Sequence, residues 1–271
     1  MPSQRGSRVH MTSTRNEVAV ILTFEVVSFV RSPPRIESNS LASKGTAMSE
    51  PLHSIVYATS SGGTTLDQDQ FGGNPFATAL IKLSLRPDLN LTQLLPALRR
   101  LTHKKSEKHQ TPAWDVLPSN CDWSFPLAAG SDRERRIALV LIVSEYSPAP
   151  RLIGAAHDER RIASMLAGHG FSVVQGIAPD RQSLVKALRS FAIKSKDFDV
   201  AVIYSTGHGV ELGGQVFLLP GTYPRQHGDR ASELRKHGIS VRQIAAACKA
   251  LKVNLTFFAG CRTEMRDNNA R

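Results

Sequence analysis

Apolar positions in the second half of the chain gather into short runs, and amphipathic stretches separate these runs. Continuous apolar character is typical of parallel strands that are covered on both faces. The strand-like runs are Ile137–Val143, Phe171–Val174, Val200–Tyr204 and Asn254–Phe258. Segments with apolar residues at helical spacing lie between them and begin at Asp158, Asp180 and Ser240. This alternation predicts an α/β domain with a mostly parallel sheet flanked by helices on both faces.

The first half of the chain carries a second group of expected elements. Ile55–Thr59 is rich in strand-forming residues and ends in Ser60–Gly63, which is typical of a turn. Asn74 followed by proline indicates a helix start, because Asn caps helices and proline fits the first helical position. Leu91–Leu101 repeats leucine at helical spacing, although Pro96 inside this run favours a kink or a break.

Composition divides the chain into four parts. Residues 1–50 are rich in Ser, Arg and Thr without sustained periodicity, and we expect a poorly ordered extension there. Its apolar stretch Val18–Val30 contains Glu25 and is shorter than the roughly 20 residues that a membrane span requires. We therefore expect no membrane segment, and we read the stretch as a strand or extension. Residues 51–125 form the first folded segment, 126–136 a charged linker, and 137–271 the segment with the four apolar runs.

Charge and cysteine content narrow the class of protein. The chain of 271 residues has 34 Lys plus Arg and 23 Asp plus Glu, so its formal net charge is 34 − 23 = +11. The basic residues are spread along the chain without an aromatic-interleaved strip, so we predict no nucleic-acid partner. Three cysteines are too few for a disulfide scaffold and favour a reducing compartment, for which we predict the cytoplasm.

The side chains that could take part in a reaction follow the ends of two predicted strands. Ligand sites in parallel sheets lie at the carboxyl ends of the strands. His208 follows the run Val200–Tyr204, and Cys261 follows the run Asn254–Phe258. A thiol becomes a nucleophile when a nearby base takes its proton, and a histidine can later protonate a leaving amine. The backbone N–H groups of Gly209 and Cys261 are candidates for stabilising a developing oxyanion.

These strand ends resemble those of a known family. Tyr204-Ser-Thr-Gly-His-Gly-Val210 and Phe257-Phe-Ala-Gly-Cys-Arg262 are similar to the histidine and cysteine motifs of caspase-like cysteine peptidases, especially the bacterial metacaspase-like branch. A histidine about 50 residues before the cysteine is a known property of caspases. The resemblance covers about Arg136–Arg266 and implies a three-layer sandwich with a mostly parallel sheet between helices.

The resemblance also implies a peptidase of family C14, a thiol hydrolase. Its endopeptidase activity would use His208 as general base and acid and Cys261 as nucleophile. The amides of Gly209 and Cys261 would form the oxyanion hole. It implies protein or peptide substrates cleaved through a thioester, with no metal site and no cofactor, and it leaves a calcium requirement and the oligomeric state open.

The chain departs from this family in two respects. Ala259 stands where metacaspase-like members have Asp and caspases have Gln, so neither substrate preference carries over. The chain ends ten residues after Cys261, where the family continues into a small-subunit half, and residues 51–125 resemble that half instead. Either the domain is circularly permuted, or the chain joins parts of two tandem domains. Permutation, which we favour slightly, predicts that Ile55–Thr59 pairs with Asn254–Phe258; in the other case an open sheet edge remains there.

A second function remains open beside the peptidase. A catalytically degenerate member of the family would act as a protein-interaction module without cleavage. Of the other candidate residues, Cys248 is expected in the core and Cys121 in a structural role, and Asp199 is read as a residue at a strand edge.

Overall fold

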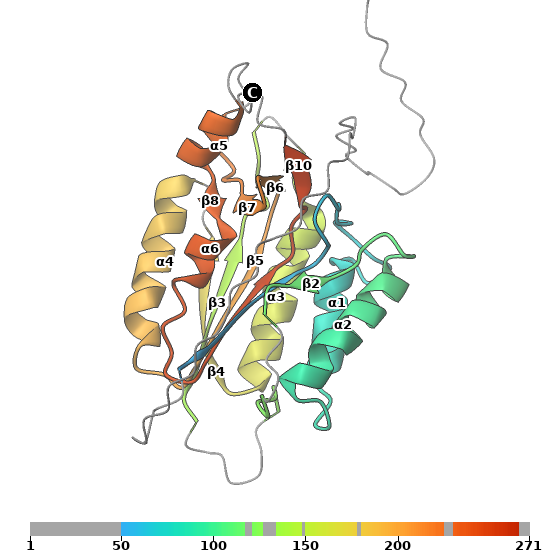
Figure 1. Cartoon of the computed structure of the whole chain (residues 1–271), viewed down its shortest axis with the longest axis vertical. Coiled ribbons are helices and arrows are strands. Elements are labelled where there is room, and N and C mark those ends of the chain that lie inside the picture. Colours follow the sequence, from blue (N-terminus) through green and yellow to red (C-terminus); the bar gives the residue numbers. More distant parts are fainter. Residues whose placement is uncertain are drawn as a thin grey trace, which may run out of the picture. The chain divides into compact units, whose positions relative to one another are not determined.

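The apolar runs of the sequence form the centre of a six-stranded sheet, which Figure 1 shows between two layers of helices. The computed structural model describes residues 50–116, 121–126, 134–147, 150–177, 180–224 and 230–265. The strand order is β2-β1-β9-β5-β3-β4, and all neighbours are parallel except the β1–β2 pair. The strands are β1 (Leu52–Tyr57), β2 (Ala113–Trp114), β3 (Arg136–Ile142), β4 (Phe171–Ile177), β5 (Val200–Thr206) and β9 (Val253–Phe258). The predicted three-layer α/β fold is confirmed.

Each central strand is buried on both faces because its side chains alternate between two hydrophobic cores. Ala138, Val140 and Ile142 of β3 belong to one core, and Leu139 and Leu141 belong to the other. Such double burial explains why the sequence of β3 is continuously apolar and does not alternate with polar residues.

One face of the sheet is covered by α1 (Pro75–Ser84), α2 (Leu91–Lys105) and α3 (Ile153–Gly168), as Figure 1 shows. The expected cap of α1 is present, since the Asn74 side chain accepts a hydrogen bond from the Phe76 amide. The second helix continues through Pro96 and begins with a capping box. The third begins five residues before Asp158, which was its expected start.

The opposite face carries α4 (Arg181–Ser195) and the short α6 (Val241–Ala245). Both helices begin where the sequence predicted, with the side chains of Asp180 and Ser240 accepting hydrogen bonds from backbone amides in the first turn. Cys248 follows α6 and is buried in this core, as expected, and burial raises the pKa of its thiol to about 12. The Cys248 thiol is therefore protonated and unreactive at neutral pH.

A second, smaller sheet extends the strand ends and has the order β10-β6-β7-β8. The pair Gly213-Gly214, which is typical of a hairpin turn, joins β6 and β7, and both glycines have the positive φ that a two-residue hairpin turn requires. Helix α5 (Arg230–His237) shares a small hydrophobic core with this sheet. The strands are β6 (Gly209–Leu212), β7 (Gln215–Leu218), β8 (Ile239–Ser240) and β10 (Thr263–Met265).

The first folded segment joins the second within one sheet. β1 pairs in parallel with β9 over its whole length, from Leu52 opposite Val253 to Tyr57 opposite Phe258. This is the pairing that the permuted arrangement predicted, and it leaves β9 flanked by a strand on each side. All described residues belong to one compact unit, Met48–Arg271. The stretch Val18–Val30 lies outside the described residues.

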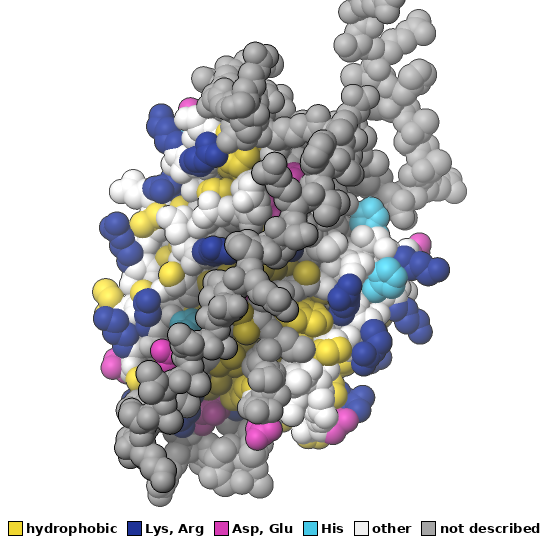
Figure 2. All heavy atoms as spheres, in the orientation of Figure 1, with side chains coloured by type: hydrophobic (Ala, Val, Ile, Leu, Met, Phe, Trp, Pro, Cys, Tyr) yellow, Lys and Arg dark blue, Asp and Glu magenta, His cyan; other side chains and the backbone are white. Residues whose placement is uncertain are grey.

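Three further expectations concern the end of the linker, the distribution of basic residues and membrane segments. Arg136, expected at the end of the linker, is the first residue of β3, and its buried guanidinium donates hydrogen bonds to the carbonyl oxygens of Phe125 and His169. Lys and Arg side chains are dispersed over the face in Figure 2 and do not merge into one patch. None of the described helices is both long and apolar enough to cross a lipid bilayer.

Candidate active site

The two loops that carry His208 and Cys261 lie side by side between the large and the small sheet. In the large sheet Ser205 of β5 is the register partner of Phe258 of β9, an offset of 258 − 205 = 53 residues. In the small sheet Val210 of β6 is the partner of Thr263 of β10, and 263 − 210 gives the same offset. Because the offset is unchanged across the intervening residues, His208 is the lateral neighbour of Cys261, for which 261 − 208 = 53.

Glycines allow the two loops to approach closely. A Cβ added to Gly209 would overlap the carbonyl oxygen of Cys261, and one added to Gly260 would lie 2.6 Å from the carbonyl oxygen of Gly207. Gly207 also has a φ of +153°, which side chains rarely adopt. The glycine-rich surroundings of both motifs are therefore a packing requirement of the contact between them.

Tyr146 holds the histidine loop through its hydroxyl group. The hydroxyl accepts a hydrogen bond from the His208 amide at 2.8 Å and donates one to the Leu219 carbonyl oxygen at 3.1 Å. The Leu219 amide in turn donates to the His208 carbonyl oxygen at 2.9 Å, so the hydroxyl is inserted where a second backbone hydrogen bond would join the two residues. Burial raises the pKa of Tyr146, which keeps its proton available for donation. The rings of Tyr146 and His208 are 4.3 Å apart between centroids.

The cysteine loop is held by the turn that follows β1. The Gly62 amide donates to the Arg262 carbonyl oxygen at 3.0 Å, and the Arg262 amide donates to the Gly63 carbonyl oxygen at 2.8 Å. Cys261 itself is half-buried, and its Sγ lies 3.2 Å from the amide nitrogen of Thr65 and 3.3 Å from the Thr65 hydroxyl. The first folded segment therefore contacts the candidate nucleophile directly.

A buried ion pair also supports the cysteine loop. The Arg262 guanidinium donates to both carboxylate oxygens of Glu211, at 3.0 and 3.3 Å, and the exposed fractions of the two side chains are 13% and 5%. Glu211 also accepts a hydrogen bond from the Ser61 hydroxyl at 2.9 Å, and Arg262 lies over the Tyr57 ring at 4.4 Å. This cluster connects β6, the residue after Cys261 and the first segment.

Other sequence-derived candidates lie apart from this contact. Ala259 is 2% exposed and belongs to the core, so its side chain offers no group to a substrate. Asp199 precedes β5 at the opposite end of the strand from His208, where its carboxylate accepts from the Arg135 amide and pairs with Lys252. Cys121 is half-buried, and burial raises the pKa of its thiol.

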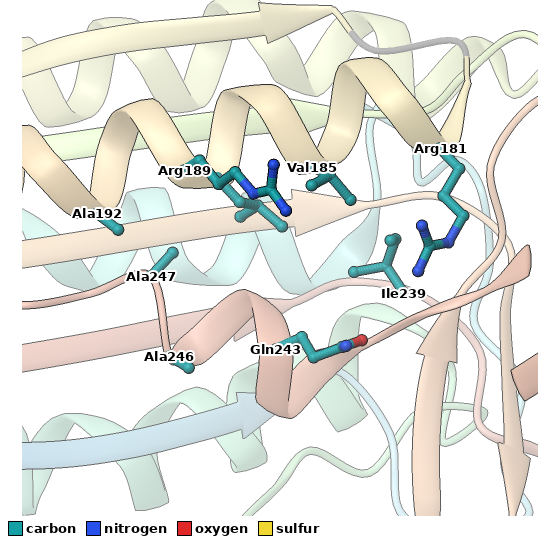
Figure 3. Close-up of a pocket in the computed structure, with 9 residues that line it drawn as sticks. Arg181, Val185, Arg189, Ala192, Ile239, Gln243, Ala246 and Ala247 are labelled. Atoms are coloured by element: carbon teal, nitrogen blue, oxygen red, sulfur yellow. The ribbon is translucent and has the colours of Figure 1, made fainter. Parts of the chain in front are cut away.

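The surface of the described residues is hollowed in at least two places. One, of about 360 Å³, lies between α4 and α6, where Figure 3 shows Arg181, Arg189 and Gln243 around it. It contains no residue of the strand-end loops, so it is separate from the candidate site. The other, of about 540 Å³, lies between Gln68 and Gly72 of the first segment and the start of α3. Within the described ranges no group of three or more His, Cys, Asp or Glu side chains is arranged to hold a metal ion.

The sequence alone indicated the two strand-end loops but not the residues that hold them. Thr65 and the Glu211–Arg262 pair act through tertiary contacts across 196 and 51 residues, which no local pattern reveals. Tyr146 had a weak signal, because it follows the apolar run Ile137–Val143 by three residues. An aromatic residue with a polar tip just beyond a buried strand is placed to reach the strand-end loops.

Comparison with known proteins agrees with the fold and the strand-end motifs. Residues 135–268 match the caspase domain of the C14 peptidases, a segment that contains both His208 and Cys261. A search of curated proteins found no match to the chain. Residues 135–268 therefore form a segment of the caspase-domain type that is found in the C14 family of cysteine peptidases.

Proposed function

We propose that the chain is a cysteine endopeptidase in which His208 and Cys261 form a catalytic dyad. The observation that carries this proposal is the common offset of 53 residues in both sheets, which makes the two residues lateral neighbours. The close approach of Gly209 to Cys261 supports it, because it brings the backbone of the two loops into contact. The match to the caspase domain supplies the reaction class.

The proposed reaction has two stages. The His208 imidazole takes the proton of the Cys261 thiol, and the thiolate attacks the carbonyl carbon of the scissile peptide bond. The amides of Gly209 and Cys261 stabilise the resulting oxyanion. The imidazolium then gives its proton to the leaving amine, which leaves a thioester on the enzyme. Water, deprotonated by His208, hydrolyses this thioester, which releases the carboxylic acid and restores the thiol.

The first folded segment belongs to the same proposal as the small-subunit-like part of a permuted domain. The parallel pairing of β1 with β9 supports this assignment, as do the contacts of Gly62 and Gly63 with Arg262. In the proposed boundaries, residues 51–125 complete the sheet beside the strand that carries Cys261, and residues 137–271 supply the two motifs. The chain would fall in the bacterial metacaspase-like branch, with a substrate preference of its own because Ala259 is buried.

Substrates and compartment follow from the proposed chemistry. The chain would act on proteins or peptides in a reducing compartment such as the cytoplasm. All three cysteines are free thiols, which supports this placement.

Substitution of each dyad member tests the proposal. The parent, Cys261→Ala, His208→Ala and a control, Cys121→Ala, are incubated with a mixture of unstructured peptides, and the products are identified by mass spectrometry. We expect both dyad variants to lose about 10³-fold or more of the cleavage rate and the control to retain it. Cleavage by Cys261→Ala at the parent rate would refute the assignment.

Buried Ala259 favours a second candidate function, a degenerate caspase-like module that binds a protein partner without cleavage. At this position the chain presents no charged group that could hold a substrate side chain. In that case the parent and Cys261→Ala would bind the same peptides with equal affinity, and neither would release products.

A further inference from the structure

The sulfur of Cys261 has contacts to a residue far outside the matched family segment. The Thr65 amide nitrogen lies 3.2 Å from Sγ, and the Thr65 hydroxyl oxygen lies 3.3 Å from it. Thr65 precedes Cys261 by 196 residues, and the segment that matches the caspase domain begins only at residue 135. The reacting atom of the proposed peptidase is therefore contacted from a part of the chain that the family match does not include.

The Thr65 backbone is fixed on both sides. Before it, Gly62 and Gly63 exchange two backbone hydrogen bonds with Arg262, the residue next to Cys261. After it, the Leu66 amide donates to the side-chain oxygen of Gln110 at 3.1 Å, and Gln110 is fully buried. The backbone that presents the Thr65 amide to the sulfur is thus held in place from both sides.

The two Thr65 groups match the ionised form of the cysteine. A backbone N–H can only donate, so the sulfur is the acceptor in that contact. A hydroxyl and a neutral thiol can each donate to the other, but a thiolate has no proton and can only accept. Both contacts therefore become donations to sulfur when Cys261 ionises, and hydrogen bonds to a charged acceptor are the stronger ones.

We propose that Thr65 is a catalytic residue that stabilises the Cys261 thiolate through its amide and its hydroxyl. This inference rests on the proposed function, in which Cys261 is the nucleophile. It makes residues 50–116 part of the reactive centre, so the thiol reaches full reactivity only when this segment is docked.

The same contact would have the opposite effect if the Thr65 side chain blocked the approach of the sulfur to a substrate. The two effects differ in sign. Removal of the Thr65 hydroxyl lowers thiol reactivity if the group stabilises the thiolate, and raises it if the group blocks the sulfur.

The test measures alkylation of the full chain by iodoacetamide, with the modified peptides quantified by mass spectrometry. The variants are Thr65→Val, which keeps the shape and the amide, and Thr65→Ser, which keeps the hydroxyl; Thr65→Ala is a second deletion if the valine variant misfolds. The matched control is Thr64→Val, because the Thr64 hydroxyl contacts His109 and not the sulfur. Buried Cys248 serves as an internal reference in every sample.

At about pH 7 we expect Cys261 alkylation to fall about tenfold in Thr65→Val, the loss of one charge-assisted hydrogen bond. Thr65→Ser and Thr64→Val should stay within about twofold of the parent. At about pH 10, where thiolates form without help, Thr65→Val should react like the parent. A faster or unchanged reaction at pH 7, or an equal loss at both pH values, would overturn the inference.

The alkylation test of Thr65 and the cleavage test of the proposed function can fail independently of each other. Alkylation requires no peptide hydrolysis, so the effect of Thr65 on the thiol can be measured even if Cys261→Ala still cleaves peptides. If cleavage is lost in Cys261→Ala but Thr65→Val is alkylated normally, the peptidase proposal stands and the role of Thr65 fails.

Discussion

Segments 50–116 and 134–265 hold the proposed active site by different kinds of interaction. The second segment supplies His208 and Cys261 on strands that are buried in two hydrophobic cores. The first segment reaches the site through backbone and polar contacts, such as those of Thr65 with the sulfur and of Asp67 with the start of α3. Hydrophobic burial fixes the positions of the strands, while polar contacts fix the orientation of the loops that carry His208 and Cys261 at the strand ends. We therefore expect the loss of a single polar contact between the segments to affect activity measurably.

The largest expected effect concerns Asp158, whose carboxylate accepts a hydrogen bond from the Asn74 amide and pairs with Arg161. Burial raises its pKa from 3.8 to about 7 despite these two partners. The unfolded chain therefore binds fewer protons at Asp158 between about pH 4 and 7. The free energy of unfolding should consequently fall across this window, by up to about 4 kcal/mol.

Urea unfolding of the parent and of Asp158→Asn across this pH range measures the effect, since the variant should lack this fall. Comparison of the two proteins cancels the opposite contributions of His53 and His169, whose pKa values burial lowers. An equal pH dependence in both proteins would show that Asp158 does not control this contact between the segments.

The next largest effect is expected at the ion pair behind the cysteine loop. Arg262→Met leaves Glu211 buried with the Ser61 hydroxyl as its remaining partner, which should cost about 3 kcal/mol of unfolding free energy. The control is Arg86→Met, because the Arg86–Asp88 pair is exposed on both sides and should contribute nothing measurable. Equal stability of the two variants in urea would contradict the structural importance of the buried pair.

A contact within the second segment is tested by Gly209→Ala. The added methyl group would overlap the Cys261 carbonyl oxygen, so the two loops must separate. We expect a loss of about 2 kcal/mol in stability and about 30-fold in peptide cleavage. Gly168→Ala is the matched control, since nothing lies within 4 Å of its added Cβ at the end of α3. If Gly209→Ala behaves like this control in both assays, the two loops are not in tight contact.

The smallest effect is expected at the N-terminal cap of α3, which is supplied by Asp67 of the first segment. The Asp67 carboxylate accepts from the amides of Gly154 and Ala155 at 2.9 and 3.2 Å, so Asp67→Ala should cost about 1 kcal/mol. Asp180→Ala removes the equivalent cap of α4, which is local to that helix. Thermal unfolding should detect both changes, while peptide cleavage should fall only in Asp67→Ala. A fall in both would mean that cleavage follows general stability.

The central strands of the large sheet were predictable because each one is marked by its own sequence and not by contacts with distant residues. A run such as Ile137–Val143 is apolar at every position, and residues such as Asp180 and Ser240 mark helix starts by their own side chains. The start of α3 was missed for a physical reason. Leu152 at its N-cap position has no capping side chain, and the cap comes from Asp67 in the other segment.

The placement of the two strand-end residues at one edge of the sheet was predictable from the sequence, whereas the contacts that hold their loops were not. The strand-end rule brought His208 and Cys261 to one edge, as the registers of the two sheets confirm. In the small sheet that continues this edge, the Gly213-Gly214 hairpin is the part with a local sequence signal of its own. β10 is three residues long and partly exposed, and its pairing with β6 depends on the large sheet being formed.

The pairing of β1 with β9 also has a consequence for the order of assembly. Leu52 and Val253 are register partners at a separation of 253 − 52 = 201 residues, although each strand is only six residues long. Contacts at such sequence separation form slowly, because the loop between them must close first. During synthesis, β1 leaves the ribosome long before its partner exists and has to wait for it. The strand made early therefore joins the sheet late, so that β3, β4, β5 and β9 can be paired with one another before the reactive centre is complete.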